Sequence, residues 1–210
     1  LFVIGAVVIV AVVYMHEGRR RIPVQYSKRV VGRRVYGGQS THIPLRINMA
    51  GVIPVIFASS ILALPSTVAA FVPAAWAQSL VQWFNPQSVL YVSVYALLII
   101  FFTYFYTAIQ FNPATVSDNL RKYGGYIPGI RPGRPTTEYL DRVLIRITLA
   151  GAVFLAVIAI MPVFFGDITN VPNIFFGGTA LLIVVGVSLE TMKQIESHLL
   201  MRQYEGFIRR

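Results

Sequence analysis

Residues 125–137, GYIPGIRPGRPTT, combine the residue types that suit the binding of an anion. The stretch has three prolines, three glycines and no acidic residue, so its backbone is stiff at the prolines and turns tightly at the glycines. We expect such a backbone to present Arg131 and Arg134 rather than bury them. The nearest acidic residues in the sequence are Asp118 and Glu138, and we expect neither to claim a guanidinium group. Both arginines are then free to bind a phosphate or carboxylate of a partner.

Other chemistries are excluded by the residue inventory. The sequence has no cysteine, and its three histidines, His16, His42 and His198, lack the spacing of metal ligands. It also lacks the GxxxxGK[ST] motif that binds the phosphates of ATP. The apolar segments contain no Asp, Glu, Lys, Arg or His except Glu190 at the end of the last one, whereas transporters and membrane enzymes place such groups at depth. We therefore predict no enzymatic activity, no cofactor and no metal site.

The elements that position the arginines are predicted from hydrophobicity. Of the 210 residues, 56% are hydrophobic and 12% are charged, whereas soluble domains are about one half apolar and about one quarter charged. We predict an all-α, polytopic bundle of transmembrane helices. Residues 1–15 give roughly 22 Å of helix, short of the roughly 30 Å hydrocarbon layer, and are interpreted as the end of a truncated span. Complete spans are predicted at 48–72, 88–111, 147–165 and 175–192.

The basic residues mark alternate connections between these spans. Residues 16–47 hold eight Lys and Arg against one acid, residues 112–146 hold six, and the tail at 193–210 is also basic. The connections at 73–87 and 166–174 contain no Lys or Arg. Because cytoplasmic loops are rich in Lys and Arg, the basic segments and the C-terminus are predicted to be cytoplasmic and the other two connections external. Charge alone would only set orientation or attract anionic membrane lipids, but the stiff backbone of 125–137 favours a docking role.

The span at 48–72 is predicted to move. Gly51 and Pro54 interrupt its first half, where Pro54 removes a backbone hydrogen bond and kinks the helix. Ser59, Ser60 and Pro65 interrupt its second half. The serines suit a helix that sometimes faces water or a polar client. The alternative is that small residues only allow close helix packing, and that alternative is favoured for Ala50, Gly51 and Ala58.

Three long stretches of the chain resemble the SecY family, the channel-forming subunits of bacterial protein translocases. They are RRIPVQYSKRVVGRRVYGGQSTHIPLRINMAGVIPVIFASSI, FFTYFYTAIQFNPATVSDNLRKYGGYIPGIRPGRPT and FGGTALLIVVGVSLETMKQI. They occur in the order of the family, and the resemblance extends over essentially all 210 residues. It implies that the chain is the C-terminal half of a SecY-type channel: the end of the sixth span and then spans seven to ten.

The resemblance implies roles for the basic loops. In the family, these loops dock the ribosome and the SecA motor ATPase, and the arginine of the GIRPG motif, here Arg131, is central to motor-driven translocation. The other docking candidates are Arg134, Arg21, Lys28, Arg33 and Arg34. Those in the loop at 16–47 would meet ribosomal RNA phosphates by attraction that does not depend on sequence.

The resemblance also implies a pore and a gate. Ile56 and Ile183 match two members of the family's apolar pore ring, which excludes water and ions by dewetting. From the residues alone, both isoleucines would be interpreted as packing or lipid-facing. In the family, the lateral gate uses spans seven and eight against spans two and three of the other half, and the span with Gly51, Pro54, Ser59 and Ser60 fits that gate.

The function implied is a protein-conducting channel in the bacterial plasma membrane. It would pass unfolded secretory polypeptides across and release membrane segments into the lipid, with SecE, SecG and the N-terminal half of the same channel as partners. Half of a secondary transporter would need a polar site at midplane, and a membrane enzyme would need clustered catalytic residues. The one charged cluster at a span end contains Glu190, Thr191 and Lys193, and is interpreted as a helix terminus with Glu190 and Lys193 one turn apart.

Overall fold

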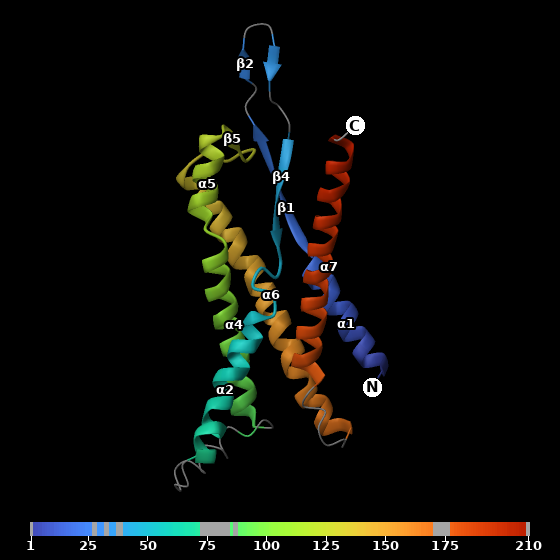
Figure 1. The fold of residues 1–210 in the computed structure, drawn as a ribbon. Coiled ribbons are helices and arrows are strands. Elements are labelled where there is room, and N and C mark those ends of the chain that lie inside the picture. The colour runs from blue at the N-terminus through green and yellow to red at the C-terminus, as the bar shows by residue number, and fades with distance from the viewer. Residues whose placement is uncertain are drawn as a thin grey trace.

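The computed structural model of the chain describes residues 2–26, 29–31, 34–36, 40–71, 85, 88–169 and 177–208. The predicted external connections at 73–87 and 166–174 lie largely outside these residues. The described elements are α1 (Phe2–Glu17), β1 (Arg19–Tyr26), β2 (Arg29–Val31), β3 (Arg34–Tyr36), β4 (Ser40–Arg46), α2 (Ile53–Phe71), α4 (Val89–Gln110), α5 (Pro113–Lys122), β5 (Gly125–Tyr126), α6 (Arg134–Thr169) and α7 (Gly177–Ile208) (Figure 1).

Long apolar helices dominate the structure. Among the described residues, three are long and apolar enough to cross a membrane: α2, the segment Val89–Lys122 that includes α4 and α5, and Arg134–Val163 of α6. Gly5–Glu17 of α1 is a shorter apolar helix. The helix α7 continues without a break to Ile208, so the residues at 190–193 are not the helix terminus that the sequence predicts.

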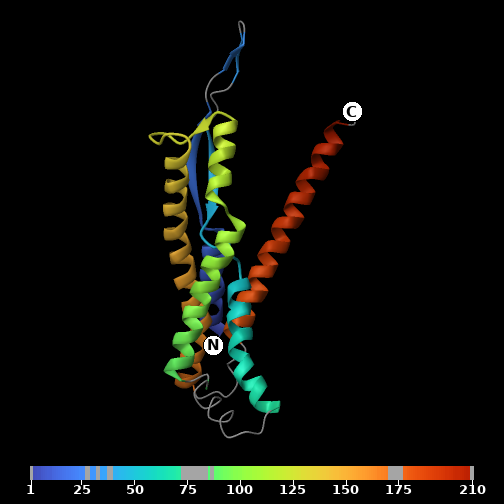
Figure 2. The same ribbon diagram turned by 90° about the vertical axis from the view of Figure 1, so that its left-hand side faces the viewer.

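The apolar helices share one core. Its buried residues come from α1, α2, α4, α6 and α7, and they include Val12, Val55, Ile99, Leu155 and Leu182. The helix α4 packs against both α2 and α6, while α7 contacts α1 and α6. Figure 2 shows α7 leaning away from the column of α4, α5 and α6. The lower part of α7 therefore belongs to this core, while its C-terminal part extends beyond it.

The basic loop at 16–47 contains strands that hydrophobicity does not predict. Strand β1 pairs antiparallel with both β4 and β5, so the sheet order is β4-β1-β5, and Ile22 lies opposite Ile43. Strands β2 and β3 form a separate hairpin at the far end of this loop (Figure 1). Burial alternates along β1, with Ile22 and Val24 buried between exposed neighbours, as expected for a strand with one covered face.

A second core lies beneath this sheet. Ile22, Val24 and Leu45 from the sheet pack with residues of α5, α6 and the connection between them, namely Leu120, Ile127, Leu140 and Val143. Full burial of an aliphatic side chain contributes roughly 1.5–3 kcal/mol. The two basic loops predicted from charge therefore form one packed platform, defined here as β1, β4, β5, α5 and the beginning of α6.

Two glycines allow the platform and the membrane core to meet closely. A Cβ on Gly151 of α6 would lie 2.7 Å from the carbonyl oxygen of Ile47, between β4 and α2. A Cβ on Gly186 of α7 would lie 2.8 Å from Val52 Cγ1, just before α2. At Gly151 the close atom belongs to the backbone, so this position requires glycine. At Gly186 the close atom is a side-chain methyl group of Val52, which has to shift to make room for a larger residue.

Candidate functional site

The loop between β5 and α6 forms the tip of the platform. Gly129 and Gly133 have φ of 81° and 108°, in the region that favours glycine. Ser117 Oγ of α5 donates to the Gly133 carbonyl at 2.9 Å, and Thr136 Oγ1 of α6 donates to the Arg131 carbonyl at 2.8 Å. Ser117 and Thr136 are buried, so the loop is clamped from both helices and its conformation is fixed.

Arg131 is exposed on this clamped loop. Within the part of the chain that the structure describes, its side chain has no ion pair. Its backbone carbonyl is held by Thr136, so the attachment point of the side chain is rigid while the guanidinium group stays in solvent. This arrangement suits the binding of an anion supplied by another molecule.

The expectation that neither arginine is claimed by a carboxylate is wrong for Arg134. Its Nε donates to Glu138 Oε1 at 3.1 Å, and the two side chains are 90% and 60% exposed. The reason is that α6 begins at Arg134, thirteen residues before the predicted span at 147, and so places Glu138 one helical turn away. An exposed pair of this kind contributes about 0.3–0.5 kcal/mol, and a phosphate that binds Arg134 displaces it at little cost.

The other predicted docking residues are only partly described. Arg21 is exposed on β1, opposite Pro44 of β4. Arg34 is the first residue of β3, and only its main chain is described. Lys28 and Arg33 lie outside the described residues.

The first turn of α2 corrects the predicted role of Pro54. Because α2 begins at Ile53, Pro54 lies in the first helical turn, where no backbone N–H is needed, and it does not kink the helix. Its side chain is fully buried. The change of direction comes before it, at Gly51 with φ of 64°, where Asn48 Nδ2 donates to the Gly51 carbonyl at 3.0 Å.

The two serines of α2 are satisfied within their own helix. Ser59 Oγ and Ser60 Oγ both donate to the carbonyl oxygen of Ile56, at 2.9 Å and 2.8 Å. A hydroxyl group that bonds back to the preceding turn is tolerated in an apolar setting and favours slight bending of a helix. The serines therefore need no polar client to be stable in a span.

The two predicted pore residues lie on different helices. Ile56 of α2 is 40% exposed, although Val55 and Ala58 on either side of it are completely buried. Ile183 of α7 is half-buried. One face of α2 thus packs in the membrane core while Ile56 is directed away from the most buried face.

A polar cavity of about 350 Å³ lies between the ends of α1 and α4, the beginning of α2, and α7. Arg46, Glu190 and Lys193 bring charges of both signs to its lining. Asn48 is buried at its wall, and its Oδ1 has no hydrogen-bond partner among the described residues. Glu190 lies seven residues after Ile183, two turns or about 10 Å along the same side of α7. The cavity is therefore next to the predicted pore residues in both α2 and α7.

Lys193, which lines this cavity, also forms an ion pair with α1. Lys193 Nζ of α7 lies 2.5 Å from Glu17 Oε1 of α1, and Arg19 is 3.9 Å from the same carboxylate. The hydrogen bond from Lys193 lowers the pKa of Glu17, and burial followed by the charge of Lys193 lowers the pKa of His16. The sequence interpretation grouped Lys193 with Glu190 and missed Glu17. Glu17 is the one acid among eight basic residues in the loop at 16–47, and that was the available signal.

Comparison with known sequences identifies relatives along nearly the whole chain. The family model described as SecY matches residues 1–192. A protein translocase subunit SecY of Streptomyces galbus is 54% identical over 98% of this chain, and the homologue of Thermotoga maritima is 48% identical over 100% of it. The chain spans about half the length of these relatives, 48% in both cases.

Comparison with solved structures shows the fold. One match is described as "The structure of a protein conducting channel", with 19% identity, a TM-score of 0.55, and coverage of 93% of this chain and 48% of that one. Another, of a SecY protein with a plug domain, is 18% identical with a TM-score of 0.56, and the match covers 93% of this chain and 49% of that one. The predicted helical bundle of the SecY type is confirmed by these matches.

Proposed function

Since the chain belongs to the SecY family, we propose that it forms the C-terminal half of a protein-conducting channel of the bacterial plasma membrane. The channel passes unfolded secretory polypeptides to the outside and releases apolar segments sideways into the membrane lipids. The N-terminal half of the same channel completes the pore, and SecE and SecG are its small partner subunits. The chain performs no catalysis, and its C-terminus is cytoplasmic.

The observation that carries the proposal is the asymmetry of α2. Pro54, Val55 and Ala58 are buried against the other helices, while Ile56 is 40% exposed on a helix with no charged residue. Such a helix suits the wall of an apolar constriction, with Ile56 and Ile183 as two members of the ring. The polar cavity beside them receives the polypeptide before it reaches the ring.

The lateral gate in this proposal is α2 itself. Gly51 adopts a positive φ just before the helix, with no atom near the position of a Cβ, so the chain can change direction there without a side-chain clash. Pro54 fixes the first turn, and Ser59 and Ser60 keep their hydroxyl groups satisfied when the helix faces lipid. The helix can thus move as a unit.

The docking function resides in the platform. Arg131, helped by Arg134, binds an acidic group of the SecA motor, and the basic strand loop with Arg21, Lys28, Arg33 and Arg34 meets the phosphates of ribosomal RNA. The support for this part is the clamped conformation of the tip and the exposed guanidinium group of Arg131, which has no ion pair with any described residue.

Site-specific crosslinking in the full-length channel tests the proposal. A photoreactive residue at position 56 or 183 should form adducts with a secretory chain that is stalled during export. Position 101 is a matched control, because Phe101 is 60% exposed on a different helix, α4, and is not one of the predicted pore residues. Equal adduct yields from positions 56 and 101 would exclude a polypeptide path along α2.

A further inference from the structure

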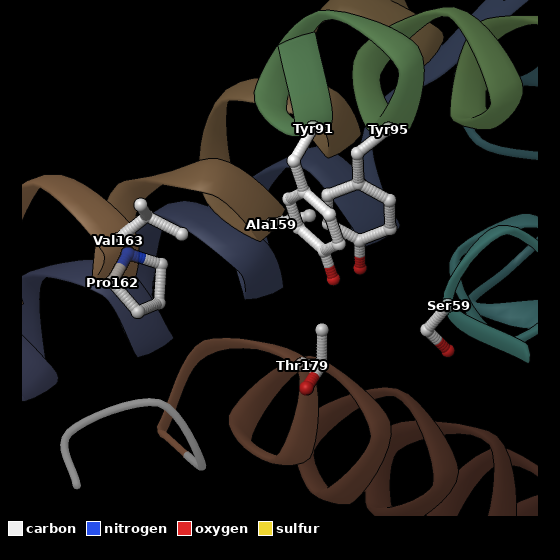
Figure 3. A pocket seen from close by; sticks show the side chains of 7 residues that line it. All are labelled: Ser59, Tyr91, Tyr95, Ala159, Pro162, Val163 and Thr179. Carbon is white, nitrogen blue, oxygen red and sulfur yellow. The ribbon is translucent and has the colours of Figure 1, made fainter. Parts of the chain in front are cut away.

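A second cavity lies among the membrane helices, separate from the polar cavity that is lined by Arg46, Glu190 and Lys193. It has a volume of about 230 Å³, is partly open, and is lined by Ser59 of α2, Tyr91 and Tyr95 of α4, Pro162 of α6 and Thr179 of α7 (Figure 3). Residues from four helices therefore meet around one space.

The cavity contains a buried hydroxyl group that lacks a partner. Tyr95 is 4% exposed, and its Oη has no hydrogen-bond partner among the described residues. Figure 3 shows the hydroxyl groups of Tyr91 and Tyr95 side by side, both directed into the space towards Thr179. The two rings lie 6.0 Å apart. A buried polar group is normally paired with protein, water or a ligand, so Tyr95 indicates an occupant that can hydrogen bond.

The remaining walls define the chemistry of that occupant. Among the described residues that line the cavity, the side chains carry hydroxyl groups and apolar groups but no Asp, Glu, Lys, Arg or His, so these residues offer a charged ligand no compensation for its lost hydration. Ser59 Oγ donates to its own helix and is left with acceptor capacity, and Pro162 has no N–H to offer. Ala159, Pro162 and Val163 supply an apolar wall. An apolar cavity of about 150 Å³ is sufficient for benzene, so this larger space admits a phenol-sized molecule.

We propose that this cavity is a binding site for a neutral amphiphile of phenol size. Its hydroxyl group exchanges a hydrogen bond with Tyr95 Oη, and its ring lies against Ala159, Pro162 and Val163. The occupant touches α2, α4, α6 and α7 together and so restrains α2 against its neighbours. Binding itself is independent of the proposed function, whereas the restraint of a gate rests on it.

Photoaffinity labelling of the full-length channel complex in phosphatidylethanolamine and phosphatidylglycerol vesicles tests binding. The probe is a phenol with a trifluoromethyl diazirine in the para position, and adducts are mapped by mass spectrometry. We expect saturable labelling of peptides from α2, α4, α6 and α7 that unlabelled 4-cresol competes for better than 4-methylanisole, which cannot donate.

Two variants test the role of Tyr95. Tyr95→Phe should raise the probe concentration at half-saturation about three- to tenfold, because one hydrogen bond is lost. Tyr14→Phe is the matched control, because Tyr14 is 80% exposed on α1 and lies outside the cavity. In Ala159→Leu, the larger side chain fills the cavity, so saturable labelling should be abolished although Tyr95 is unchanged.

Three results would overturn the proposed site. Labelling that spreads over lipid-facing helices without saturation would mean that the probe only partitions into the bilayer, and no labelling above background would mean that the cavity holds water. Equal labelling of Tyr95→Phe and the unchanged protein would exclude the hydrogen bond with Tyr95. Export is measured separately in the same vesicles. Saturable binding with unchanged export would leave the site standing and refute its restraint of α2, whereas failure of the crosslinking at position 56 would refute the channel function alone.

Discussion

Replacing Gly133 by alanine should loosen the docking tip without removing any side-chain contact. Gly133 has φ of 108°, and a Cβ added there would meet no atom within 4 Å. The cost is therefore backbone strain alone, about 1–3 kcal/mol for a residue other than glycine in such a conformation. The Gly133 carbonyl accepts hydrogen bonds from Ser117 Oγ and from the backbone N–H groups of Thr136 and Thr137, so a change of φ disturbs all three.

Hydrogen exchange measures this strain directly. Opening of the loop becomes more favourable by the strain energy, so the amides of Thr136 and Thr137 should exchange about 5- to 150-fold faster in Gly133→Ala. The affinity of the purified motor for the channel should fall as well, because the same change releases the attachment point of Arg131. Amides of the membrane core, such as that of Ile99, should be unaffected.

The matched control is Gly5→Ala in α1. A Cβ added at Gly5 would also meet no atom within 4 Å, but Gly5 lies inside a helix, where alanine is favoured by roughly 0.5–1 kcal/mol. A general effect of the added methyl group would appear in both variants. Unchanged exchange at Thr136 and Thr137 in Gly133→Ala would refute the conclusion that the tip is held in a conformation that only glycine adopts.

Three further outcomes follow from the described contacts. Arg131→Glu should abolish motor-driven export in vesicles, because it reverses the charge of the docking group on an exposed, clamped loop. The variant should still insert in the membrane as well as the unchanged protein does. Normal export would contradict the docking role of Arg131. The pKa of Glu17 lies below its ordinary value of 4.5 through its bond with Lys193, so the stabilisation is present above pH 4.5 and is lost as the pH falls through the folded pKa. In Glu17→Gln, the melting temperature should fall less as the pH is lowered below 4.5. If the melting temperature of the variant depends on pH in the same way as that of the unchanged protein, the ion pair contributes nothing to stability. Gly151→Ala should destabilise the protein by about 1–3 kcal/mol in thermal unfolding, since its Cβ would lie 2.7 Å from the backbone oxygen of Ile47, and neutrality would mean that α6 moves aside easily.

The sequence predicts the membrane helices because their signal is local. A run of apolar residues without charge specifies a span by itself, since lipid requires every backbone group to bond within the segment. The likeness to channel structures confirms the resulting bundle. The docking, pore and gate roles of individual residues stay predictions, because a residue's role depends on partners that the chain does not contain.

The platform was not predicted because its pairing is non-local. Strand β1 pairs with β4 across about twenty residues and with β5 across about a hundred, and the three consecutive arginines at its start hide the alternation at Ile22 and Val24. The ion pair of Arg134 was missed for a related reason: the first turns of α6 are polar and carry no hydropathy signal. Pro54 was misread because its effect depends on where the helix begins, which the turn at Gly51 decides.

The helix α6 connects the docking platform with the membrane core. It begins at Arg134 beside the docking tip, contributes Leu140 and Val143 to the platform core, and then contributes Leu155 to the membrane core. Its 36 residues form about 54 Å of continuous helix, whose first proline after the opening turn is Pro162, at the wall of the inner cavity. A load on the tip is therefore borne by a helix that is packed at both levels, and not by a flexible linker. In the proposed mechanism, the close approach of Gly151 to Ile47 between the two cores passes that load to the chain that leads into α2.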